Sequence, residues 1–342
     1  MLLQAAQDGQ EGAQRYRREP SIARLGELGA FSADTRPSAL LLRRALLALH
    51  VPPAVLAWPR RFIRTPARLA QVDRFLWRYA FWSGVRRGLS DRDTWRRFSR
   101  APVILMYHAV GGRDEAPSWY VMPQRRLRWQ MRWLRWCRYR IIPLSELVVH
   151  LRSDRLPPAR AVVITFDDGY ADNYHLALPV LRKLHIPATV FLVSREIGGE
   201  ANWTTEPAIA GRPLLTDGLI SKLLDGRFDV GAHTRTHVSL TDVTDAETRE
   251  HEIAGSRHDL EGSLGRPIRT FAYPFGDYDS DVAEIVRRAG FHAACCSRPG
   301  ANDPATPLFE LRRVEVRGTD PLWRFPYMVW SGRRVRRTPG KS

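Results

Sequence analysis

AVVITFDDGY, residues 161–170, is the stretch that decides the fold class of this chain of 342 residues. Its first residues are apolar and mostly β-branched, which is typical of a strand buried on both faces of a parallel sheet. Asp167 and Asp168 follow where the strand should end, and Gly169 allows a sharp turn. Two adjacent carboxylates repel each other, so a cation is their natural neighbour. An Asp-Gly turn that caps a helix is the alternative interpretation.

Strand-like runs alternate with helical segments after residue 101. Strands are predicted over 103–106, 161–166, 187–193, 228–232, 270–273, 291–296 and 311–316, and helices over 123–139, 144–151, 174–184, 215–224, 245–264 and 279–289. This order predicts an α/β fold with parallel strands, in the form of a distorted (β/α) barrel, complete or incomplete. No phosphate-binding glycine motif follows a strand, so nothing supports nucleotide binding.

Polar residues follow four of these strands at their predicted C-terminal ends. His108 follows VILMY, Asp167 and Asp168 follow VVITF, His233 follows FDVGA, and the segment 274–277 follows TFAY. In an α/β barrel the C-terminal strand ends converge on one face, where active sites lie. We therefore expect these residues to share one site.

His233 and His237 belong to the motif HTRTH. Their spacing of four residues puts both imidazoles on one face if the motif forms a helical turn. Two histidines and one carboxylate hold zinc or a similar divalent ion in many proteins. A structural role is the alternative for an isolated HxxxH pattern, and the Asp pair at a neighbouring strand end favours the metal site.

The motifs TFDDGY (165–170), HTRTH (233–237) and FAYPFG (271–276), in that order, resemble those of the polysaccharide deacetylase family. This family is also called the NodB-homology or carbohydrate esterase family 4 group, and the resemblance covers about residues 101–320. It implies a distorted (β/α) barrel that removes acetyl groups from N-acetylated sugars, usually N-acetylglucosamine in a polymer, with the help of a metal. We assign the catalytic domain to residues 101–325, with the core motifs within 160–300.

The resemblance also implies roles for single residues. Asp168, His233 and His237 match the ligands of a divalent metal, for which zinc is the first expectation. Asp167 matches the general base that activates the attacking water, and Tyr170 matches the residue whose backbone N–H stabilises the oxyanion. The same division of roles suits amide hydrolysis, which needs an activated water and a partner for the developing negative charge.

Two departures from the family pattern leave roles open. The arginine that usually braces the base is replaced by Ala272, and Arg313 in the stretch RVEV is our candidate substitute, with an ordinary surface arginine as the alternative. The usual histidine near the C-terminus is absent. His108 is our candidate general acid, as in a branch of the family that acts on exported poly-N-acetylglucosamine. A buried structural histidine is the alternative.

Aromatic residues near the motifs are candidates for substrate binding, because sugar faces pack well on aromatic rings. They are Trp203, Tyr273 and Phe275, together with Pro274 between the last two, and each could instead belong to the core. The expected partner is a carbohydrate that carries N-acetyl groups. Two rival functions stay open, a hydrolase of another non-peptide C–N bond and a non-catalytic sugar-binding module. The complete set of two Asp and two His residues argues against the second.

Residues 1–100 are predicted to form an Arg-rich helical appendage, with 19 arginines, no lysine and 8 acidic residues. Within it, the stretch RFLWRYAFWSGVRR (74–87) interleaves arginine with aromatic residues. This pattern is typical of a helix on an anionic membrane surface and equally of a helix docked on a neighbouring domain. Nucleic-acid binding is disfavoured, because no recognisable module frames the stretch. Residues 326–342 are predicted to be a basic tail.

The whole chain carries a formal net charge of +17. Its first residues lack the layout of a signal peptide, and it has no apolar run long enough to span a membrane. These features predict a protein that is cytoplasmic or peripheral to the inner membrane.

Overall fold

The computed structural model describes residues 1–19, 37–89, 91–153, 155–225, 228–303 and 306–334. The chain forms two compact units. The first comprises Met1–Ala101 with Ser153–Ala159 and Asp303–Ala305, and the second comprises Pro102–Arg152, Arg160–Asn302 and Thr306–Ser342.

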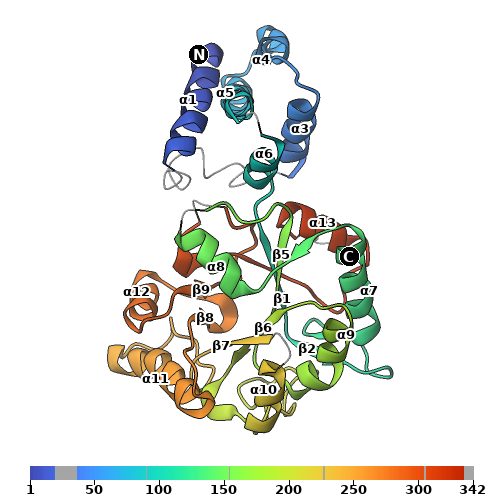
Figure 1. Ribbon diagram of the computed structural model, residues 1–342, viewed down its shortest axis with the longest axis vertical. Coiled ribbons are helices and arrows are strands. Elements are labelled where there is room, and N and C mark those ends of the chain that lie inside the picture. The colour runs from blue at the N-terminus through green and yellow to red at the C-terminus, as the bar shows by residue number, and fades with distance from the viewer. Residues whose placement is uncertain (20–36, 90, 154, 226–227, 304–305, 335–342) are drawn as a thin grey trace. The chain divides into compact units, whose positions relative to one another are not determined.

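The second unit is a nearly closed barrel of parallel strands (Figure 1). The strand order is β10-β1-β5-β6-β7-β8-β9, with β4 beside β5. A bridge between Cys295 and Leu311, just before β10, joins the two ends of this order. The predicted α/β barrel is therefore confirmed. The strands are β1 Val103–Tyr107, β4 Arg140–Ile141, β5 Ala161–Phe166, β6 Ala188–Leu192, β7 Phe228–Ala232, β8 Thr270–Ala272, β9 Ala293–Cys295 and β10 Arg313–Glu315.

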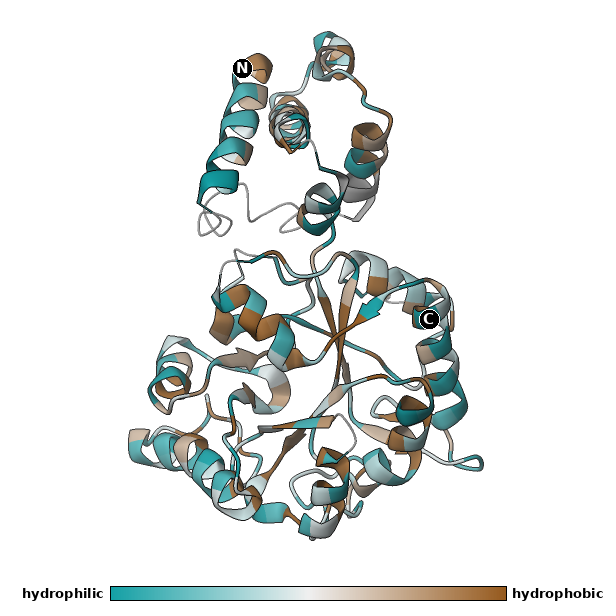
Figure 2. Ribbon diagram, in the orientation of Figure 1, coloured by the Kyte–Doolittle hydropathy of each residue, from teal (hydrophilic) through white to brown (hydrophobic). Residues whose placement is uncertain are grey.

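Helices surround the strands on the outside of the barrel (Figure 2). The two faces of β5 are both buried, which explains why all its residues except Thr165 are apolar. Val162, Ile164 and Phe166 pack in the cluster that contains the surrounding helices, whereas Ala161 and Val163 pack in a second cluster with the apolar face of α8. The helices are α7 Gln124–Trp136, α8 Leu144–Arg152, α9 Leu178–Lys183, α10 Asp217–Leu224, α11 Ala246–Leu264, α12 Ser280–Arg288 and α13 Arg324–Ser331.

The region predicted as a basic tail begins with a packed helix. Phe325, Met328 and Val329 of α13 are buried in the main core of the barrel unit. The prediction of a tail from residue 326 is therefore wrong for this helix. Its apolar residues recur at helical spacing, but the arginines before and after them suggested an exposed segment. Residues 335–342 lie outside the described part of the chain.

The first unit is helical. Its helices are α1 Leu2–Arg18, α3 Pro37–Ala48, α4 Pro53–Ala57, the 3₁₀ helix η2 Trp58–Phe62, α5 Pro66–Gly88 and α6 Arg92–Ser99. α5 contains the Arg/aromatic stretch 74–87, and its Tyr79, Trp82 and Val85 are fully buried. The structure shows this stretch packed on other helices of its own unit, so it tests neither the membrane surface nor the neighbouring domain. Among the described residues, no helix is long and apolar enough to cross a membrane.

Two glycines allow α1 and α5 to pack closely. A Cβ atom on Gly84 would collide with the backbone oxygen of Ala6, and one on Gly9 would collide with the backbone oxygen of Phe81. Small residues at such crossings let two helix backbones approach each other. The helix pair therefore depends on glycine at both positions.

Candidate active site and metal centre

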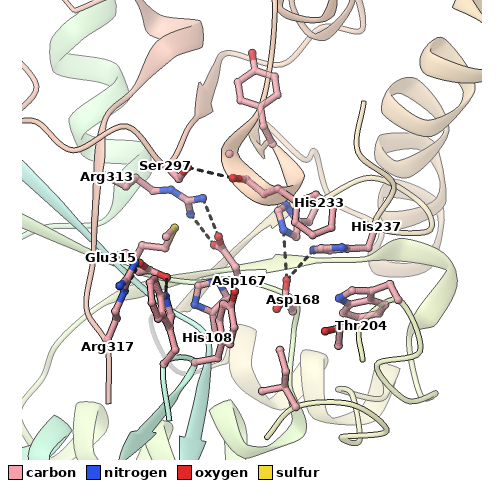
Figure 3. A pocket seen from close by; sticks show the side chains of 18 of the residues that line it. His108, Asp167, Asp168, Thr204, His233, His237, Ser297, Arg313, Glu315 and Arg317 are labelled. Carbon is pink, nitrogen blue, oxygen red and sulfur yellow. Dashed lines mark hydrogen bonds and ion pairs between the residues drawn. The ribbon is translucent and has the colours of Figure 1, made fainter. Parts of the chain in front are cut away.

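The C-terminal ends of the strands surround a pocket of about 370 Å³ (Figure 3). Most of the residues predicted from the sequence line this pocket. They are His108, Asp167, Asp168, Trp203, His233, His237, Tyr273, Phe275 and Arg313. Residues that are far apart in the sequence therefore share one site, as the barrel geometry requires.

Asp167 and Arg313 form a bidentate ion pair inside this site. Nη1 and Nη2 of Arg313 lie 2.6 and 2.7 Å from the two carboxylate oxygens of Asp167, and both side chains are almost fully buried. Arg313 also donates from Nε to the backbone oxygen of Cys296. Burial alone would lower the pKa of Arg313, but the charge of Asp167 outweighs it and the pKa is raised. Arg313 is thus a buried partner of Asp167, so the alternative of an ordinary surface arginine is wrong.

Asp168, His233 and His237 form a buried group that could hold a metal ion. Oδ1 of Asp168 lies 3.4 Å from Nε2 of His233 and 3.2 Å from Nε2 of His237. The ligand atoms of the three residues all lie within 4.8 Å of one another. Burial alone would raise the pKa of Asp168, but the two histidines outweigh it and hold this pKa well below its usual range. The carboxylate is therefore ionised and faces two imidazoles.

The hydrogen bonds of this group favour a cation between its members. Nδ1 of His233 lies 2.7 Å from the backbone oxygen of Ala272, which can only accept, so Nδ1 carries the proton. In the neutral imidazole, Nε2 then presents a lone pair toward the Asp168 carboxylate. Two acceptors in this position repel unless a cation lies between them, and a metal-bound histidine commonly donates its other N–H to a carbonyl. The donor set therefore suits a divalent metal.

HTRTH forms a tight loop, and the expected helical turn is wrong. Thr234 and His237 both have positive φ angles, 62° and 61°, so the two histidines converge through the loop itself. The hydroxyl of Thr234 donates to the backbone oxygen of His233 and accepts from the backbone N–H of His237. This hydroxyl links the two candidate ligands and replaces helical hydrogen bonding.

Glu252 on α11 holds the same loop from behind, and the sequence analysis missed it. One of its oxygens accepts from the backbone N–H groups of Arg235 and Thr236 at 2.9 and 3.0 Å, and the other accepts from the Thr236 hydroxyl. Asp259 pairs with the Arg235 side chain. Glu252 is buried although α11 is a polar helix, and nothing in the local pattern of the sequence distinguishes it from the exposed acids around it.

Tyr170 lies just after the Asp pair and is fully buried, but its side chain does not line the pocket. Asp168 and Gly169 before it have φ angles of 71° and 75°, which turns the chain sharply after β5. In the described part of the chain, no acceptor takes the backbone N–H of Tyr170.

His108 follows β1 and lies in the pocket beneath the two aspartates in Figure 3. Its ring is half-buried and meets the edge of Tyr120 at a centroid distance of 5.2 Å. Its backbone oxygen accepts from the Asn173 side chain, which fixes this strand end. The side chain thus has contact with the cavity, unlike a fully enclosed structural histidine.

Two of the four candidate substrate-binding residues expose surface to the pocket. Trp203 stacks on His237 at a centroid distance of 4.7 Å, and Phe275 is 58% exposed at the edge of His237. Tyr273 and Pro274 are buried, and the Tyr273 hydroxyl donates to the backbone oxygen of Phe309. A fully buried ring cannot stack on a sugar, so stacking by Tyr273 is corrected to a role in the wall.

A charged group that the sequence analysis missed also lines the pocket. Glu315 at the end of β10 accepts from the indole N–H of Trp119 at 2.7 Å, from Arg317 at 2.7 Å and from Arg334 at 3.0 Å. The Arg317 guanidinium lies over the Trp119 ring. Trp119 precedes a short strand, β3 Val121–Pro123, which pairs with β2 Ala109–Gly111. Trp119, Glu315, Arg317 and Arg334 thus line the same pocket as His108.

Comparisons with known proteins agree with this geometry. A family model described as polysaccharide deacetylase matches residues 154–294. The chain is 27% identical to YxkH of Bacillus subtilis over 234 residues, which cover 68% of this chain and 78% of that protein. It is 24% identical to the poly-β-1,6-N-acetyl-D-glucosamine N-deacetylase of Staphylococcus epidermidis over 234 residues, 63% of this chain and 78% of that one.

Solved structures show the same barrel. The structure of IcaB from Ammonifex degensii matches with a TM-score of 0.58 and 26% identity, over 68% of this chain and 98% of that one. The deacetylase PplD of Streptococcus pyogenes, in complex with acetate, also has a TM-score of 0.58, with 20% identity, and supports the fold alone. The motifs, the barrel and these matches agree, and residues 154–294 match the polysaccharide deacetylase family.

Proposed function

We propose that this protein hydrolyses the N-acetyl groups of N-acetylglucosamine units in a poly- or oligosaccharide, with Asp167 as general base and a divalent metal, zinc first, as cofactor. One observation carries the proposal: a buried, arginine-paired carboxylate lies beside a buried Asp-His-His group in one pocket. Polar groups that converge in one pocket are typical of a binding or active site.

Asp168, His233 and His237 would hold the metal. Two imidazole nitrogens and one carboxylate oxygen form a donor set that zinc accepts, with positions left open for water and substrate. When bound, the ion would lower the pKa of a water molecule and polarise the acetyl carbonyl. All other steps depend on the side chains and the backbone of this chain.

Asp167 would accept the proton of the attacking water. Arg313 takes one lone pair on each carboxylate oxygen, and each oxygen keeps another that can accept a proton. The bidentate pair fixes the plane of the carboxylate, so its free lone pairs point in a constant direction. Positioning of this kind is a major part of general base catalysis.

His108 would give a proton to the leaving amine, and the Tyr170 backbone N–H would donate to the developing oxyanion. His108 lies in the same pocket as Asp167, and an imidazolium there could donate this proton. Amide hydrolysis then balances, since water supplies the hydroxyl group of acetate and the amine leaves with a proton.

A polymeric substrate is supported by a second cavity of about 430 Å³, which shares Gly276, Ser297 and Pro299 with the first. Exposed Phe275 lines the first cavity next to Gly276, which lines both, and would offer a ring face to a neighbouring sugar. The named activity of the Staphylococcus relative makes β-1,6-linked N-acetylglucosamine the first polymer to test.

The decisive experiment measures acetate release from β-1,6-linked N-acetylglucosamine oligomers by the zinc-loaded full-length chain. We expect release by the wild type, its loss in Asp167→Asn, and wild-type release in Asp281→Asn, which changes an exposed carboxylate on α12. A folded, metal-loaded protein that binds the oligomers without releasing acetate would favour the sugar-binding module. Hydrolysis of other amides alone would favour the rival C–N hydrolase.

A further inference from the structure

The helical unit exposes an apolar surface along α4 and η2. Val55, Trp58 and Phe62 are 60%, 59% and 65% exposed, and their spacing of three and four residues places them along one side of a helical turn. Neither α4 nor η2, both fully described, contains a buried residue. Large apolar side chains gathered on one exposed segment mark an interaction site more often than a free surface.

Arginines accompany these apolar residues. From Pro37 to Val72 the chain has six arginines and no aspartate or glutamate. Arg61 lies over the rings of Trp58 and Phe62, at 4.0 and 5.1 Å from their centroids. Arg61, Arg64 and Arg68 have no carboxylate partner within the described ranges, whereas Arg60 pairs with Asp73. The segment therefore combines exposed aromatic rings with uncompensated positive charge.

A cavity of about 450 Å³ in the same unit lies at the N-terminal end of α4. Its lining includes Pro52 and Pro53 before α4 and the basic side chains His50, Arg86 and Arg87. The other lining residues are mainly apolar, although Asp91 is also present. An apolar cavity with a basic lining suits a ligand that has an anionic head and an apolar body.

We propose that the helical unit docks on an anionic phospholipid surface through the α4–η2 surface, which we define as Val55, Trp58, Arg61, Phe62 and Arg64. Aromatic rings of this kind insert at the level of the lipid headgroups, and arginines beside them pair with lipid phosphates. Charge complementarity selects this partner, because the segment has no acidic residue that would repel an anionic surface. The inference is independent of the proposed catalytic activity.

The test is sedimentation of the full-length chain with vesicles of equal parts phosphatidylglycerol and phosphatidylcholine, and with vesicles of phosphatidylcholine alone. We expect binding to the anionic vesicles that falls with rising salt and is weak on the neutral ones. Trp58→Ala/Phe62→Ala should weaken the partition at least about 10-fold, because both insertable rings are removed. Arg61→Gln/Arg64→Gln should weaken it about 5-fold for each charge.

Trp136→Ala is the matched control, since Trp136 is 80% exposed but lies on α7 of the barrel unit. It should bind vesicles as the wild type does, and all variants should keep the wild-type circular dichroism and melting temperature. Equal vesicle binding by the wild type and both double variants would overturn the proposal. Retention on a single-stranded oligonucleotide without vesicle binding would also overturn it, in favour of nucleic acid.

Discussion

Arg313→Met tests the pairing of Asp167 most directly. The substitution removes the guanidinium but keeps most of the side-chain length, and it leaves the Asp167 carboxylate buried without its two hydrogen bonds of 2.6 and 2.7 Å. Removing one partner of a buried ion pair costs about 3–5 kcal/mol. The free energy of unfolding should therefore fall by about this amount, and acetate release should fall by about 10²-fold or more.

The assay is urea unfolding followed by circular dichroism, with Arg317→Met as the matched control. Arg317 lines the same pocket and pairs with Glu315, but its side chain is 22% exposed, so its loss should cost at most about 1 kcal/mol. The double variant Asp167→Asn/Arg313→Met removes both charges. It should recover most of the lost stability but none of the activity, because an uncharged pair carries no desolvation penalty.

A small effect would refute the reasoning. If Arg313→Met and Arg317→Met lowered stability equally, the Asp167–Arg313 pair would not be buried and coupled as the structure shows. If Arg313→Met kept full activity, the assignment of Arg313 as the residue that positions the base would fail, even with Asp167 in place.

Four further outcomes follow from the same structure. A chelator should abolish acetate release and lower the melting temperature, and zinc should restore both, because a ligand that binds only the folded state stabilises it by about 2.7 kcal/mol at 100 times its Kd. His108→Gln should lower kcat by about 10²- to 10⁴-fold with unchanged zinc content by elemental analysis. Glu252→Ala should weaken zinc affinity by about 10- to 100-fold in a competition titration, more than Glu252→Gln, because the loop loses its acceptor. Gly84→Val should destabilise the helical unit by about 1–3 kcal/mol in thermal unfolding, whereas Gly262→Ala, which has open space around its Cβ position, should not.

The barrel was predictable because its signal is local and repeated. Each strand is a short apolar run that ends at a polar residue, as β1 ends before His108 and β7 before His233. The C-terminal ends of all strands in a parallel barrel lie on the same face. The topology alone therefore predicted that Asp167 and His233 lie near each other.

The contacts that hold the site were not predictable, because they join elements that are distant in sequence. Glu252 supports HTRTH from a helix whose other acids are not buried, and only the packing of α11 against the loop distinguishes it. The segments of the helical unit show the same limit. Trp82 on α5 and Trp58 on η2 have similar Arg-rich surroundings in the sequence, yet Trp82 is fully buried and Trp58 is exposed.

Asp167 receives its arginine partner from a strand that the family pattern does not predict. Ala272 stands on β8 where the family pattern has arginine, and it packs in the same apolar cluster as Phe191. Arg313 comes from β10. Its guanidinium lies over the Phe191 ring, 5.5 Å from the centroid, and binds Asp167. A long side chain at residue 272 would compete for this interior volume, because packed cores leave little free space. The small residue on β8 therefore leaves the space that the arginine on β10 occupies. A site whose motif lacks the arginine can still pair Asp167 with a positive charge, because another strand of the barrel supplies it.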